Sequence, residues 1–130
     1  MPCDLLFVYG TLRRGCMNPM AIQLAARAAY LGPARVSGSL YRIADYPGFV
    51  PGRAGRVVGD LLRLVDAEAT LAWLDAYEEV TPDFPAPHEY RREMLVVEAA
   101  GGPVPAWIYV YARDPAGLPS VAGGDFLLDG

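Results

Sequence analysis

The sequence predicts a single α+β domain whose sheet is curled or barrel-like. Its 130 residues fall within the usual size of one domain, roughly 100–150 residues. Apolar residues make up 53% of the chain and charged residues 20%, which favours a packed core over disorder. Periodicity and turn residues indicate two helices and five or six strands in mixed order. Because a doubly wound sheet needs a regular alternation of strands and helices, that fold is disfavoured.

The chain is predicted to begin with a strand followed by a helix. Residues 4–9 form a nearly continuous apolar run, which is typical of a strand buried on both faces, and Gly10 ends it. Asn18 is a suitable N-cap and Pro19 suits the first helical position. A helix is therefore expected from Asn18 to about Tyr30.

The middle of the chain changes to a pattern of period two. Residues 36–42 alternate as a strand does, and residues 56–65 are a second strand candidate. Between them, proline and glycine mark turns at 46–49 and 51–52, on either side of a short extended piece.

A second helix and two more strands follow. Asp66 is a plausible N-cap for a helix from Ala67 to about Glu79. Three prolines predict an exposed, helix-free loop from Thr81 to Glu89. Two strands are expected beyond it, over residues 90–99 and 105–112.

Composition excludes several kinds of chemistry. Eleven basic and fifteen acidic residues give a net charge of −4, which argues against a nucleic-acid partner. All eleven basic residues are arginine, so no lysine Schiff base or phosphate-loop lysine is available. His88, Cys3 and Cys16 do not have metal-ligand spacing, so no metal site is expected. No apolar run approaches the roughly 20 residues that span a bilayer, and no signal peptide is recognisable, so we expect a cytoplasmic protein with no membrane partner.

The segment YGTLRRG, residues 9–15, directly follows the first predicted strand. A glycine at a strand end lets the backbone turn sharply and leaves consecutive N–H groups unpaired, which is how an anion-binding nest forms. Thr11 adds a hydroxyl group. On local chemistry alone, an ordinary tight turn is the alternative interpretation.

The second predicted helix carries a carboxylate on its apolar stripe. Leu71, Leu74 and Glu78 are spaced i, i+3, i+7, which puts Glu78 on the core-facing side. Burial and the negative end of the helix both disfavour the charged form, so we expect the pKa of Glu78 to be raised. A raised carboxyl pKa suits a general acid/base near neutral pH. The alternative is a helix that frays before Glu78 and turns its side chain outward.

Other candidate residues carry less chemistry. Cys16 and His88 could form the thiol–imidazole pair of a hydrolase, although nothing local supports that pairing. Tyrosines near strand ends are expected mostly in the core, with one or two lining a pocket: Tyr9, Tyr41, Tyr90, Tyr109 and Tyr111.

Taken together, five segments resemble, in order, the gamma-glutamylcyclotransferase-like family. This family includes the gamma-glutamylamine cyclotransferases and the plant avirulence-induced-gene-like proteins. The segments are LFVYGTLRRG at 6–15 followed by Asn18, GSLY at 38–41 with YPG at 46–48, VGDL at 58–61, LDAYE at 74–78, and YRR leading into LVV at 90–97. The resemblance covers about residues 4–112 of a single domain, 1–130, and leaves an irregular tail, 113–130, in which Gly124-Asp125-Phe126 resembles the family's terminal motif.

The resemblance implies a small mixed β-barrel flanked by two main helices, and an enzyme without cofactor or metal. Its small-molecule substrate would be a γ-glutamyl amine or peptide that cyclises to 5-oxoproline and releases the amine. Glu78 is implied as the general acid/base, and the backbone N–H groups of residues 10–12 as donors to the α-carboxylate. The expected substrate-binding residues are Tyr9, Gly10, Thr11, Leu12, Tyr41 and Tyr90.

Two departures from the family's pattern concern the substrate. Glu79 stands where many relatives have glycine, and the loop from Thr81 to Glu89 looks long. Both lie where the leaving group would go, so the sequence does not identify the amide that is cleaved. The competing hypothesis is a non-catalytic domain of the same fold that binds an amino-acid-like ligand. The oligomeric state also stays open.

Overall fold

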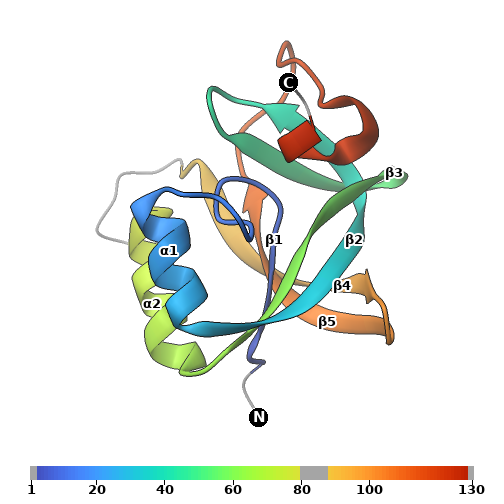
Figure 1. Cartoon of the computed structure of the whole chain (residues 1–130). Helices are drawn as coiled ribbons and strands as arrows, with labels where there is room; N and C mark the ends of the chain where they lie inside the picture. Colours follow the sequence, from blue (N-terminus) through green and yellow to red (C-terminus); the bar gives the residue numbers. More distant parts are fainter. Residues whose placement is uncertain (1–2, 80–87, 129–130) are drawn as a thin grey trace.

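The computed structural model describes residues 3–79 and 88–128, and its strands form a closed barrel in the order β1-β3-β2-β4-β5 (Figure 1). Neighbouring strands are antiparallel, except that β1 and β5 are parallel where Leu6 faces Trp107. The predicted α+β class and mixed barrel are therefore confirmed. The elements are β1 (Leu5–Val8), α1 (Pro19–Ala26), β2 (Ala28–Arg42), β3 (Pro47–Leu64), α2 (Ala67–Tyr77), β4 (Tyr90–Ala99), β5 (Gly102–Tyr111), and the 3₁₀ turns η1 (Ala122–Gly124) and η2 (Phe126–Leu128).

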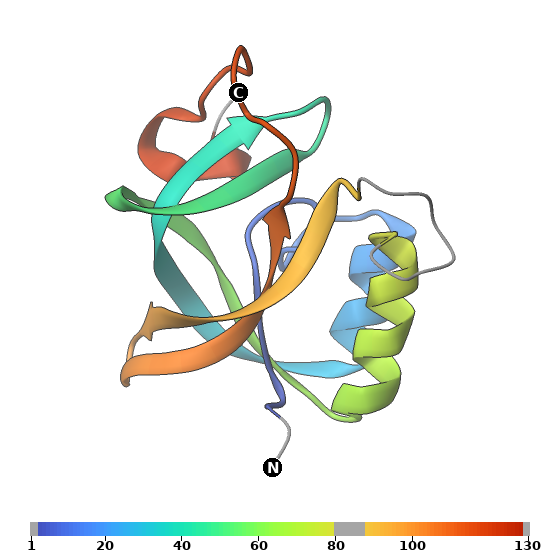
Figure 2. The same ribbon diagram turned by 180° about the vertical axis from the view of Figure 1, so that it is seen from behind.

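Both faces of β1 are buried, as its apolar run predicts. Phe7 and Tyr9 belong to a cluster with residues from all five strands, which fills the barrel. Leu6 and Val8 belong to a second cluster that also takes Leu24 of α1, together with apolar residues of α2. The two helices accordingly lie on the same side of the barrel in both views (Figures 1 and 2). The end of β1 thus lies between the barrel interior and the cluster that packs against the helices.

The first helix is shorter than predicted. Asn18 caps it as expected, because its Oδ1 accepts the N–H of Ala21 at 2.8 Å. However, α1 ends at Ala26 rather than near Tyr30, because Ala28 pairs with Leu64 and starts β2. Pairing with a strand far along the chain overrides the local helical preference here.

The strand β3 begins much earlier than predicted. It starts at Pro47, inside a segment expected to be a turn, and pairs with β2 as far as its end at Leu64. The expected turn survives only in part. Ser37 pairs with Arg56 while Gly38 pairs with Pro51, so residues 52–55 are left out of the ladder.

The second helix ends where the candidate acid begins. Its cap, Asp66, accepts the N–H of Ala69 at 3.2 Å, as predicted. The last helical residue is Tyr77, Glu78 is the C-cap, and Glu79 has a φ of 60°. This left-handed conformation is usually taken by glycine at the end of a helix.

The C-terminal tail packs onto the barrel more closely than its composition predicts. Val121 and Phe126 are buried in the interior cluster, and the N–H of Val121 donates to the carbonyl of Leu40 at 2.8 Å. Most of the loop expected from Thr81 to Glu89 lies outside the described residues. Within the described part of the chain, neither helix has the length and apolar character needed to cross a membrane.

Candidate active site

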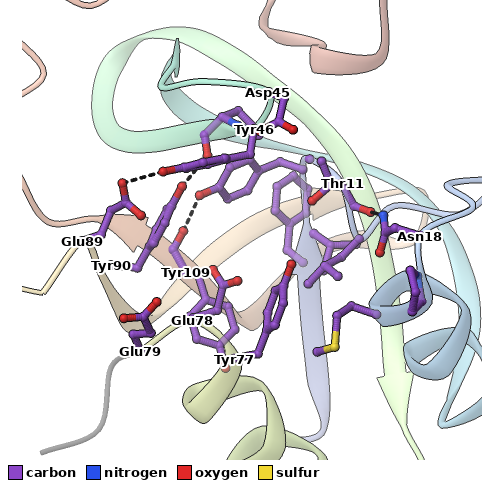
Figure 3. A pocket seen from close by; sticks show the side chains of 18 residues that line it. Thr11, Asn18, Asp45, Tyr46, Tyr77, Glu78, Glu79, Glu89, Tyr90 and Tyr109 are labelled. Carbon is purple, nitrogen blue, oxygen red and sulfur yellow. Dashed lines mark hydrogen bonds between the residues drawn. The ribbon is translucent and has the colours of Figure 1, made fainter. Parts of the chain in front are cut away.

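A cavity of about 540 Å³ opens where the end of β1, the start of α1, the end of α2 and the start of β4 meet (Figure 3). Six of the seven predicted site residues line it: Tyr9, Gly10, Thr11, Leu12, Glu78 and Tyr90. The fold therefore brings together two motifs that lie far apart in the sequence, at residues 9–15 and 74–78. Other residues around it are Phe7, Val8, Asn18, Pro19, Met20, Asp45, Tyr46, Pro47, Tyr77, Glu79, Glu89 and Tyr109.

The loop after β1 presents backbone donors to this cavity. Arg13 N–H donates to the Gly10 carbonyl at 3.1 Å, which closes a tight turn, and the Asn18 side-chain amide donates to the Thr11 carbonyl at 2.6 Å. Among the described residues, nothing accepts from the N–H groups of Gly10, Thr11 or Leu12. Consecutive N–H groups without a described acceptor, in a loop that lines a cavity, are suited to an anion such as a carboxylate.

Glu78 extends from the end of α2 into the cavity, toward Tyr90 and Tyr109, with Thr11 and Asn18 across from it (Figure 3). Its side chain is partly buried. Burial, and then the nearby charges of Glu89 and Glu79, raise the pKa of Glu78 from 4.5 to about 7. The predicted direction is confirmed, although carboxylate neighbours provide part of the shift that we attributed to the end of the helix.

Glu89 is a second carboxylate in the site, and the sequence did not predict it there. It accepts a hydrogen bond from the Tyr46 hydroxyl at 2.8 Å. Burial, together with this hydrogen bond, raises the pKa of Tyr46 to about 12. Four carboxylates line the cavity, and none of its described lining residues is basic: the acids are Asp45, Glu78, Glu79 and Glu89. The negative potential favours a ligand that brings a positive charge.

Three tyrosines form the wall behind Glu78, and each directs its hydroxyl into the protein. Tyr9 donates to the Tyr109 carbonyl at 2.6 Å, and Tyr90 donates to the Pro47 carbonyl at 2.7 Å. Tyr109 in turn donates to Asp75 at 2.7 Å. Burial raises the pKa of all three hydroxyls, so they stay protonated. The three rings shape the cavity, and each hydroxyl proton already forms a hydrogen bond within the protein.

Tyr41 is a correction among the predicted site residues, because the cavity does not reach it. It lies on β2 opposite Gly48 and forms a bridge to Ser120 in the tail. Side chains alternate along a strand, and Leu40 belongs to the barrel interior, so Tyr41 points away from that interior.

The structure adds Tyr46, Tyr109 and Glu89 to the site. Of these, only Tyr109 could have been found from the sequence, as one of the tyrosines near a strand end.

Cys16 does not line the cavity. Burial raises the pKa of its thiol, which reduces the fraction of thiolate that a nucleophile needs. In the described part of the chain, no group of three or more metal-ligating side chains is arranged to hold an ion.

Comparison with known proteins shows similarity to one family over almost the whole chain. The family described as "Gamma-glutamyl cyclotransferase, AIG2-like" matches residues 6–128. The gamma-glutamylcyclotransferase family protein YtfP of Escherichia coli K12 is 35% identical over 123 residues, covering 94% of this chain and 95% of YtfP. A putative gamma-glutamylcyclotransferase of Vibrio cholerae is 41% identical over 109 residues, covering 82% of this chain and 81% of the relative.

Solved structures have the same fold. An AIG2-like protein of Mus musculus superposes with a TM-score of 0.72 at 27% identity, covering 92% of this chain and 86% of the mouse chain. YkqA of Bacillus subtilis superposes with a TM-score of 0.71 at 28% identity; 94% of this chain is covered, but it spans only 39% of YkqA.

Proposed function

Since the chain belongs to the gamma-glutamyl cyclotransferase, AIG2-like family, we propose that it is a cyclotransferase that converts a γ-glutamyl amine or short γ-glutamyl peptide to 5-oxoproline. One observation carries the proposal: a carboxyl group with a pKa of about 7 shares a cavity with three backbone N–H groups that have no acceptor among the described residues. The two groups match the two charged groups on the α-carbon of a γ-glutamyl compound, the α-ammonium and the α-carboxylate.

The reaction needs one group that first takes and then returns a proton. The Glu78 carboxylate accepts a proton from the α-ammonium, and the free amine attacks the γ-carbonyl carbon of the same molecule. A tetrahedral intermediate forms, and its bond to the amide nitrogen breaks as protonated Glu78 returns the proton to that nitrogen. The ring nitrogen then gives its second proton, through the Glu78 carboxylate, to the released amine, which leaves as an ammonium ion. The products are 5-oxoproline and the amine, so the step consumes no water and changes no oxidation state.

The loop of residues 10–12 supplies the positioning. With the α-carboxylate held on its N–H groups, the α-amine lies on the side of the cavity where Glu78 projects. The attack is intramolecular, so holding the chain in a folded shape before cyclisation provides much of the rate enhancement. The acidic surroundings attract the ammonium form of the substrate, and the raised pKa of Glu78 makes proton transfer to it easier.

Replacement of the proposed base tests the function. We expect Glu78→Gln to fold normally and to lose 5-oxoproline formation by at least about 10²-fold, measured by mass spectrometry over a panel of γ-glutamyl amines and peptides. Glu68→Gln is the matched control, because Glu68 is exposed on the first turn of the same helix. Unchanged turnover in Glu78→Gln would end the proposal. A wild-type protein that is stabilised by these compounds without product would instead be a binding domain.

The same assay distinguishes the proposed cyclotransferase from a hydrolase that uses the Cys16 thiol. Because Cys16 does not line the cavity, Cys16→Ser should keep full turnover. Loss of turnover in that variant, with Glu78→Gln active and glutamate formed in place of 5-oxoproline, would favour the hydrolase.

A further inference from the structure

Arg13 links the proposed carboxylate-binding loop to the C-terminal tail. Its Nε lies 3.5 Å from Oδ2 of Asp60, and its Nη1 lies 2.8 Å from Oδ1 of Asp125. The Arg13 side chain is only 11% exposed, so this arginine is held between two acids rather than in solvent. It directly follows Leu12, the last of the three residues with open N–H groups.

One side of this arrangement belongs to the barrel. Asp60 lies on β3 opposite Val8, and it is almost completely buried. A buried carboxylate requires donors, and Oδ2 of Asp60 receives the backbone N–H of Arg14 at 2.8 Å in addition to Arg13. Asp60 therefore anchors the far end of the loop to β3, the strand that pairs with β1 where the loop begins.

The other side comes from the tail, which holds Asp125 in a defined place. Phe126 is buried in the barrel interior, and Asp125 also accepts the N–H of Leu127 at 3.1 Å. Gly124 has a φ of 68°, and a Cβ there would lie 2.0 Å from the carbonyl oxygen of Arg56. The tail backbone thus packs directly on β3, which only glycine allows at this position.

We infer that Asp125 is a positioning residue of the site: through Arg13 it keeps the N–H groups of residues 10–12 aligned for a carboxylate. The interaction with Asp125 is the shorter of Arg13's two ion pairs. Without it, one edge of a largely buried guanidinium loses its partner, and the loop relieves this by shifting Arg13 toward water. The identity of the ligand rests on the proposed function, whereas the coupling of tail and loop does not.

Kinetics and binding provide the first test. In Asp125→Asn, KM for the γ-glutamyl substrate should rise about 5- to 20-fold with kcat within about 3-fold, because carboxylate binding contributes to ground state and transition state alike. Affinity for added 5-oxoproline, measured by calorimetry, should fall by a similar factor. Asp125→Glu should recover part of both losses. Asp114→Asn is the control, because Asp114 is exposed and its described hydrogen bond, from the N–H of Ala116, stays within the tail.

Hydrogen exchange provides a test that needs no turnover. Amide exchange at Arg13 and Arg14, whose N–H groups donate to the Gly10 carbonyl and to Asp60, should become at least about 5-fold faster in Asp125→Asn and stay unchanged in Asp114→Asn. Equal loop exchange and equal KM in Asp125→Asn and wild type would overturn the inference. So would a lower melting temperature with neither change, since that outcome marks a purely structural residue. If wild-type protein forms no 5-oxoproline from any panel compound, the proposed function fails, and loop exchange alone decides the role of Asp125.

Discussion

At the scale of single residues, the fold places Glu78 where its charged form is disfavoured. The side chain is partly withdrawn from water and lies near the charges of Glu89 and Glu79, which raises its pKa to about 7. A carboxyl whose folded-state pKa is raised contributes its stability below the unfolded value, about 4.5, and that contribution is lost as pH rises through 7. The protein thus gives up stability near neutral pH and keeps a carboxyl group that can change its protonation state there.

The pH dependence of activity should follow this residue. Glu78 must be ionised to accept a proton, so kcat/KM should increase with pH through an apparent pKa near 7. Glu89→Gln removes a negative neighbour and should move this limb to lower pH. Glu98→Gln, an exposed carboxylate on β4, is the control and should leave the limb in place. The measurement is a profile of kcat/KM over about pH 5 to pH 9 for wild type and both variants. A limb at the same pH in Glu89→Gln and wild type would contradict the electrostatic account.

At the scale of elements, a charged network joins the last turn of α2 to the barrel. Arg92 of β4 donates to both carboxylate oxygens of Asp75 at 2.8 and 3.0 Å, and Tyr109 of β5 donates to the same group at 2.7 Å. Arg92 also stacks over Trp107, with its guanidinium carbon 4.2 Å from the ring centroid. Because Asp75 precedes Glu78 by about one helical turn, this network sets where the helix ends and where Glu78 projects.

Removing one hydroxyl should reveal the contribution of this network. Tyr109→Phe keeps the aromatic ring that lines the cavity and deletes the donor to Asp75. We expect a loss of about 1 kcal/mol in the free energy of unfolding, measured by urea denaturation, and a fall in kcat of about 3-fold or more. Tyr30→Phe makes the same chemical change at a hydroxyl with no partner among the described residues. If both variants lose equal stability and equal activity, the network does not position the helix end.

At the scale of the whole molecule, the barrel closes because its long strands bend at glycines. The register between β2 and β3 shifts where Gly38 faces Pro51, and Gly38 has a φ of 150°. A Cβ there would lie 2.4 Å from the carbonyl oxygen of Val50. This bend lets β2 pair with β3 on both sides of Gly38. The strand β2 can therefore run from the helices to the tail.

Filling that bend should destabilise the whole domain. We expect Gly38→Ala to lower the free energy of unfolding by roughly 2–4 kcal/mol, since both the backbone angle and the space oppose a methyl group. Gly52→Ala is the control, because nothing lies within 4 Å of a Cβ at that position, and its effect should stay within about 0.5 kcal/mol. Denaturant titration of both variants gives the comparison. Similar stability of the two would show that the bend tolerates a side chain.

Much of the local structure could be predicted from the sequence alone. The caps at Asn18 and Asp66, the two buried faces of β1 and the bounds of β4 all depend on residues within a few positions of one another. The acid on the apolar stripe of the second helix was visible for the same reason. Such features follow from backbone geometry and side-chain period, which any short segment carries in itself.

Tertiary structure decided the rest. The early end of α1 depends on Ala28 pairing with Leu64, and the placement of Tyr41 depends on which face of β2 lies inside the closed barrel. Glu89 reaches the cavity of Glu78, and Asp125 reaches Arg13, only because the closed barrel brings distant segments together. Hydrogen bonds and charge interactions act over a few ångströms in space, whatever the distance along the chain. No local pattern therefore contains these contacts until the barrel has closed.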